Sequence, residues 1–98
     1  MTLVQNDTGI VFNFNVLDEN NLNVDLTSAT VKLIWVNDAG TSNKTCIIHD
    51  AVNGLCRYII VAGDLATVGK YECELEVDFG TTKLTTNKFS FKVRQELG

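Results

Sequence analysis

Proline is absent from this 98-residue sequence, and histidine occurs once, as His49. The lack of proline, together with many Thr, Val and Asn residues, favours β-strands joined by Asn- and Gly-based turns over helices. A single histidine supplies neither a Cys/His zinc site of ordinary spacing nor a histidine-dependent catalytic triad. We therefore expect a protein that is not an enzyme and that uses no metal and no cofactor.

Long apolar runs and clustered basic residues are also missing. No stretch of about twenty apolar residues occurs, and residues 1–7 lack the basic start and apolar run of a secretory signal. The net charge is -4 and the pI is about 4.7, whereas binding to phosphates requires clustered Lys and Arg. We expect no membrane segment, no nucleic-acid partner and synthesis in the cytosol.

The hydrophobic content of 45% in 98 residues is enough to fill the core of one domain without metals or disulfides. Apolar and polar residues alternate in segments of strand length that are bounded by turn residues, which is typical of half-buried antiparallel strands. We therefore predict a single domain over residues 1–98. The clearest alternation places Tyr71, Cys73, Leu75, Val77 and Phe79 against Glu72, Glu74, Glu76 and Asp78.

About six segments of this kind predict strands. They cover residues 10–16, 29–36, 44–49, 55–61, 71–79 and 82–94. Asn53 and Gly54, which separate the third and fourth segments, are a strong hairpin signal. In the last segment Leu84 is even-numbered whereas Phe89 and Phe91 are odd-numbered, so we predict a β-bulge between Leu84 and Phe89.

The sequence predicts these strands and no convincing helix, so we predict an all-β fold. The expected architecture is an immunoglobulin-like antiparallel β-sandwich, with a small closed barrel as the alternative. Residues 69–73, Gly-Lys-Tyr-Glu-Cys, resemble the Gly-x-Tyr-x-Cys of an immunoglobulin strand F, in which the tyrosine forms a corner. Trp35 precedes both Cys46 and Cys56, unlike the immunoglobulin order. The similarity therefore supports the architecture and not an antibody-type function.

Three cysteines are present. If Asn53 and Gly54 form the centre of a tight turn, Cys46 lies on the order of 16 Å from Cys56, beyond the limit of about 7 Å between the Cα atoms of a disulfide. Cys73 belongs to an apolar row and is interpreted as a small core residue. We expect three free thiols in protein made in the cytosol.

The acidic side chains of residues 72–78 do not converge as a calcium site requires, because they are spaced along a straight strand. With a turn at residues 80–81, Asp78 would oppose Lys83, and Glu74 would oppose Lys88 after one bulged residue. We predict these two cross-strand ion pairs.

Several motifs, in this order and spacing, resemble the N-terminal domain of the baseplate upper protein of tailed phages and prophages of Gram-positive bacteria. They lie at residues 10–14, 24–27, 53–54, 69–71 and 89–93. The resemblance implies a non-enzymatic structural module of the virion that attaches the host-recognition apparatus to the tail. It also implies that a helical segment follows Gly98, so that residues 1–98 would be the N-terminal fragment of a longer chain.

The expected partners are other tail and baseplate proteins or further copies of the chain, and the expected location is the tail baseplate of the virion. A small cell-surface or carbohydrate-binding β-sandwich is the alternative function. That alternative would require an exposed aromatic platform built from Trp35, Tyr58 or Tyr71. The alternation places Trp35 and Tyr71 on the buried faces of their strands, which leaves only Tyr58.

The strand predicted at residues 55–61 is apolar on both faces, which suggests that one face contacts another protein. Leu55, Ile59 and Val61 lie on one side of the strand. The other side consists of Cys56, Tyr58 and Ile60. We hypothesise that this second face, or the adjoining edge, is the interface with a baseplate subunit or another copy of the chain.

Overall fold

The computed structural model describes residues 1–97, which form strands and turns. No helix within this range is long and apolar enough to cross a membrane. The strands, in chain order, are β1 (Thr2–Val4), β2 (Val11–Asn15), β3 (Thr30–Asn37), β4 (Gly40–Thr45), β5 (Ile47–Asp50), β6 (Leu55–Ile59), β7 (Gly69–Asp78) and β8 (Lys83–Arg94).

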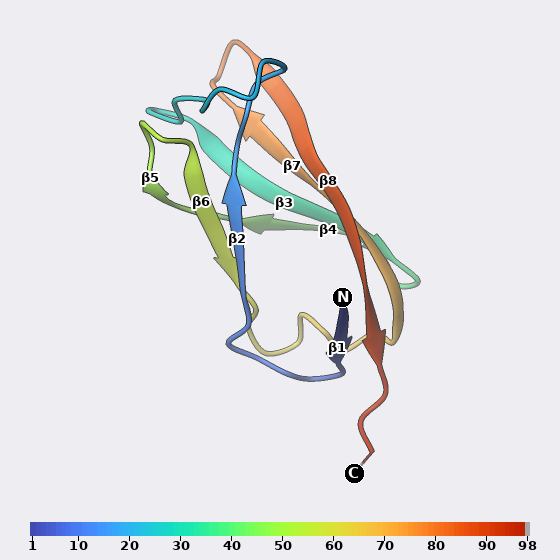
Figure 1. Ribbon diagram of the computed structural model, residues 1–98. Helices are drawn as coiled ribbons and strands as arrows, with labels where there is room; N and C mark the ends of the chain where they lie inside the picture. Colours follow the sequence, from blue (N-terminus) through green and yellow to red (C-terminus); the bar gives the residue numbers. More distant parts are fainter. Residues whose placement is uncertain (98) are drawn as a thin grey trace.

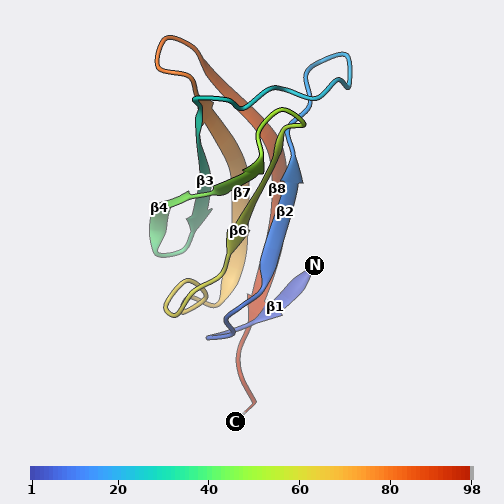
Figure 2. The same cartoon turned by 90° about the vertical axis from the view of Figure 1, so that its left-hand side faces the viewer.

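These strands form two sheets (Figure 1). The larger has the order β1-β8-β7-β3-β4 and the smaller β2-β6-β5. Neighbouring strands are antiparallel except β1, which pairs with β8 in parallel. In Figure 2 the smaller sheet lies in front of β7 and β8. The predicted antiparallel sandwich is confirmed, and the two sheets stay separate instead of closing into a barrel.

The core lies between the sheets and follows the alternation of the sequence. Strand β7 directs Cys73, Leu75 and Val77 inward, with exposed fractions of 3% or less, and its acidic residues outward. Since β3 pairs with β7 so that Trp35 opposes Cys73 and Leu33 opposes Leu75, both strands contribute one continuous apolar surface.

Tyr71 forms the corner suggested by the immunoglobulin-like motif. Its hydroxyl donates a hydrogen bond to the carbonyl oxygen of Thr67 at 2.7 Å, and its ring stacks on Phe91 with centroids 4.8 Å apart. A buried tyrosine needs such a partner for its hydroxyl. The bond anchors the loop between β6 and β7 to the core.

The predicted strand at residues 44–49 is in fact two strands in different sheets. Strand β4 pairs with β3, and β5 pairs with β6. The chain crosses between the sheets at Cys46, whose backbone N–H donates to the carbonyl of Val31 at 2.9 Å. Strand β1 and residues 40–43 of β4 were not predicted, because β1 is short and β4 (GTSNKT) has no apolar side chain with which to show alternation.

The β-bulge predicted in the last strand is confirmed. Cys73 pairs with Phe89, whereas Leu75 pairs with Thr86, so two residues of β8 oppose the single residue Glu74. Asn87 in this bulge has a positive φ of 53°, a conformation that asparagine tolerates better than most residues. The extra residue restores Phe89 to the inner face.

The two predicted ion pairs are not formed among residues 1–97. Lys83 does oppose Asp78, but its Nζ lies 3.7 Å from Glu76 Oε1. The carboxylate of Asp78 accepts a hydrogen bond from the N–H of Gly80 at 2.7 Å. The turn thus uses the Asp78 side chain, and Lys83 turns to the next acidic residue along the strand.

The hairpin at Asn53 and Gly54 is confirmed, but its register differs from the prediction. The turn is longer, with Asp50 opposite Leu55, and a bulge between Ile48 and Asp50 places Ile48 opposite Cys56. The expected 16 Å separation of the two cysteines is therefore wrong. Cys46, two residues before Ile48, instead lies on the same inner side as Cys56 and close to it, and both cysteines are buried.

Candidate protein-docking site

The face of β6 that was expected to be a protein interface points into the domain. Cys56 and Ile60 have exposed fractions of 0% and 1%, and Tyr58 packs against the same core. The larger sheet covers this face, since the ring of Tyr58 lies against Trp35 of β3. The assignment of Cys56, Tyr58 and Ile60 to a contact with another protein is therefore corrected: they contact their own domain.

Tyr58 belongs to a partly buried polar cluster. Its ring lies edge-on to Trp35, with centroids 6.2 Å apart, and its hydroxyl donates to Asp64 Oδ2 at 2.5 Å. Asp64 also accepts from the N–H of Val61 at 2.9 Å and forms an ion pair with Lys44 Nζ at 3.0 Å. The ammonium of Lys44 lies 5.3 Å from the centre of the Trp35 ring.

The pKa values in this cluster reflect its internal pairing. Burial opposes ionisation of Asp64, but hydrogen bonds from Tyr58, Val61 and Lys44 outweigh it and hold the pKa of Asp64 below its usual value of 3.8. Burial and the adjacent carboxylate raise the pKa of Tyr58. Because the donors converge on one carboxylate, the cluster links β4, β6 and the loop after β6 rather than offering a group to a substrate.

An aromatic platform for sugars is not available at the three candidate residues. Trp35 and Tyr71 are 1% and 0% exposed, and Tyr58 is held against Trp35. Aromatic stacking on a carbohydrate needs an accessible ring face, so these side chains serve the core.

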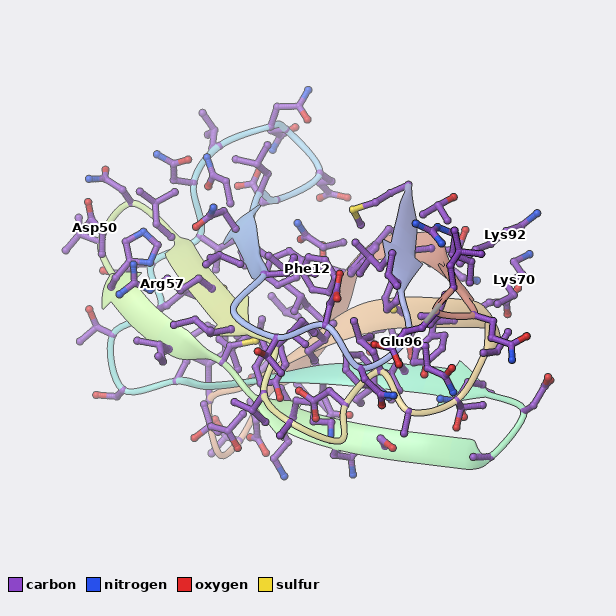
Figure 3. All side chains as sticks on the ribbon, turned by 90° about the horizontal axis from the view of Figure 1, so that it is seen from below. Phe12, Asp50, Arg57, Lys70, Lys92 and Glu96 are labelled. Carbon is purple, nitrogen blue, oxygen red and sulfur yellow. The ribbon has the colours of Figure 1, made fainter. Side chains whose placement is uncertain are left out.

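The opposite face of β6 lies on the outside of the smaller sheet. Cross-strand pairs place Ile59 beside Val11, and Arg57 beside both Asn13 and Ile47. Val11 and Ile47 are 42% and 49% exposed. Figure 3 shows Arg57 at the periphery of the molecule, whereas Phe12 lies inside. The outer surface, called the Arg57 face below, consists of Val11, Asn13, Ile47, Leu55, Arg57 and Ile59.

Arg57 is the single charged side chain of this face. Its Nε is buried without a hydrogen-bond partner, and the guanidinium forms no ion pair within the described part of the chain. An arginine among apolar neighbours is typical of the residues that contribute most to protein interfaces. Parity had placed Leu55 and Ile59 on this side, but Arg57 was missed. A sequence signal for an apolar outer surface was present at Val11, which is apolar although it shares the outward parity of Asn13 in the strand predicted at residues 10–16.

The comparisons with known proteins identify the family. A family model described as the BppU N-terminal domain matches residues 2–97. The chain belongs to this family, the N-terminal domain of the phage baseplate upper protein. The search of curated proteins found no match to this chain.

The fold of this BppU domain also occurs in a solved structure. The N-terminal domain of phage TP901-1 ORF48 is similar with a TM-score of 0.72, covering 95% of this chain and 82% of that chain at 17% identity. At this identity the likeness establishes a shared fold. Family membership makes the chain a structural module of a phage baseplate, placed in the tail of the virion and associated with other tail proteins.

Proposed function

We propose that this BppU domain attaches the host-recognition apparatus of the baseplate to the tail through protein contacts, without catalysis. The chain is made in the bacterial cytoplasm and enters the virion by docking on another tail protein. The family match over residues 2–97 supports the baseplate role. The observation that supports the docking is the Arg57 face, an exposed apolar surface around an arginine that pairs with no anion among residues 1–97.

The partner that fits this face is a tail protein with apolar side chains around a carboxylate. Val11 and Ile47 provide apolar contact area that is exposed in the isolated domain. The terminal nitrogens of the Arg57 guanidinium can bind a carboxylate with two parallel hydrogen bonds. Docking would thus give Arg57 an ion pair that it does not form within residues 1–97.

Substitution of Ile59 by Asp tests the proposal. A carboxylate beside the exposed edge of Val11 should repel an acidic partner and remove apolar contact, weakening binding by about 2 kcal/mol, or roughly 30-fold. The measurement is capture of the co-expressed tail proteins by the full-length chain. Arg57→Glu should reduce capture at least as strongly.

Val36→Asp is the matched control, because Val36 is 49% exposed on the outside of the larger sheet. It should leave capture unchanged, and circular dichroism should show that all three variants keep the fold. Normal capture by both Ile59→Asp and Arg57→Glu would rule out this face. A variant that loses only self-association in sedimentation would reassign the face to a contact between copies.

A further inference from the structure

Two cysteines meet in the core where the chain passes from one sheet to the other. Cys46 lies between β4 and β5, and its backbone is bonded to Val31 of the larger sheet. Cys56 lies in β6, the central strand of the smaller sheet, opposite Phe14 and Ile48. Their exposed fractions are 7% and 0%, and because Ile48 lies opposite Cys56, Cys46 is a diagonal neighbour of Cys56 on the buried side of the smaller sheet.

The chemistry of the pair differs from that of the third cysteine. A hydrogen bond with Cys56, followed by burial, raises the pKa of Cys46, while the same hydrogen bond lowers the pKa of Cys56 against the effect of burial. Loss of one proton therefore leaves a thiolate hydrogen-bonded to a thiol. Cys73 is buried with no such partner, and burial raises its pKa to about 12.

We propose that Cys46 and Cys56 form an intramolecular disulfide when the folded domain meets a small peroxide outside a reducing cytosol. The bond closes the loop of residues 46–56 and joins the end of β4, held on the larger sheet, to the centre of the smaller sheet. Cys73 stays a thiol, because no other cysteine lies beside it in the structure.

The reaction balances with hydrogen peroxide as the oxidant. The thiolate attacks one peroxide oxygen, the O–O bond breaks, and the departing hydroxide takes up a proton, which leaves a sulfenic acid. The sulfur of the second cysteine then displaces the sulfenic oxygen, which leaves as water with the thiol proton. Overall, two thiols lose two electrons and two protons, and one peroxide becomes two water molecules.

A peptide map of the wild-type protein tests the proposal directly. Trypsin cleaves after Lys44 and Arg57, so both cysteines fall in the peptide of residues 45–57, whereas Cys73 falls in that of residues 71–83. The folded protein is treated with hydrogen peroxide, then catalase, then denatured and alkylated. Peptide 45–57 should be unalkylated and lighter by two hydrogen atoms, and peptide 71–83 should be alkylated.

Thiol titration of the peroxide-treated protein, denatured but not alkylated, should find one free group per chain in place of the three cysteines of the sequence, and dithiothreitol should restore all three. Cys73→Ser should still form the bond, and Cys46→Ser should not. The oxidised protein should melt at a higher temperature than the reduced one, because the bond restrains the unfolded chain.

Three alkylated cysteines after treatment would overturn the proposal. Sulfinic acid at Cys46 or Cys56, or a bridge that includes Cys73, would do so as well. The wild-type map gives the answer even if Cys46→Ser does not fold.

Discussion

Gly54 occupies the turn between β5 and β6 with a φ of +71°, directly against the segment that leaves β2. Its carbonyl accepts a hydrogen bond from the N–H of Val16 at 2.8 Å, and the N–H of Val24 donates to the carbonyl of Val16 at 2.9 Å. A Cβ on Gly54 would lie 2.7 Å from the carbonyl oxygen of Val24 and 2.8 Å from that of Val16. Both the backbone conformation and the close approach therefore require glycine.

Gly54→Ala should lower the free energy of unfolding by more than the 1–2 kcal/mol or so that a left-handed backbone alone costs an alanine. The additional loss comes from the two carbonyl groups, which would have to move. Gly9→Ala is the control, because Gly9 has a φ of +80° with nothing within 4 Å of an added Cβ. Urea denaturation measures both, and equal losses would contradict the steric part of this prediction.

At the scale of the element, strand β8 depends on its bulge. Before the bulge Thr86 pairs with Leu75, and after it Phe89 pairs with Cys73 and Phe91 with Tyr71. One surplus residue is therefore absorbed at Asn87 and Lys88, where Asn87 also donates from its side chain to the carbonyl of Asn15 at 3.3 Å. The bulge thus allows even-numbered Leu84 and odd-numbered Phe89 to lie on the same face of one strand.

Deletion of Asn87 should be tolerated, because it turns the bulge into a regular ladder in which every remaining β8 residue keeps its face. Deletion of Ser90 should destabilise the domain by roughly 3 kcal/mol or more. It either turns Phe91 and Val93, each 2% exposed, toward solvent or forces Lys88 inward. Thermal melts of the two deletion variants compare them, and similar melting temperatures would contradict this role of the bulge.

At the scale of the whole molecule, Asp64 links the two sheets by polar contacts. Lys44 reaches it from β4 of the larger sheet and Tyr58 from β6 of the smaller one. The folded-state pKa of Asp64 lies below 3.8. Its ionised form therefore stabilises the fold fully above that pH, and this contribution is lost as the pH falls through the lower, folded-state value.

Asp64→Asn should reduce the free energy of unfolding by roughly 2 kcal/mol near neutral pH, because it removes charge-assisted hydrogen bonds from a buried site. The difference from the wild type should shrink below a pH of about 3.8, where the Asp64 carboxyl group of the unfolded wild-type chain becomes protonated. Denaturant titrations at several pH values measure it. Tyr58→Phe should show a smaller loss of the same kind, and a constant difference down to acid pH would contradict the ionic role.

The alternation of apolar and polar side chains is a local property, and it was sufficient to predict much of the fold. Period-two patterns identified the inner faces of β7 and β3, and the change of parity between Leu84 and Phe89 located the bulge. Both follow from the geometry of one strand, in which successive side chains point to opposite sides. The order of motifs along the chain was likewise sufficient for the resemblance to the BppU N-terminal domain.

The sequence by itself thus determined the strand faces, the sandwich class and the family, because each is encoded by neighbouring residues or by their order. Only the tertiary structure decided which side of β6 is buried, since a strand that is apolar on both faces has no preferred face until a second sheet covers one of them. It also brought Cys46 beside Cys56 and joined Lys44 to Asp64. These pairs arise from strand register and from the crossing at Cys46, which depend on contacts between segments and leave no periodic signal in the sequence.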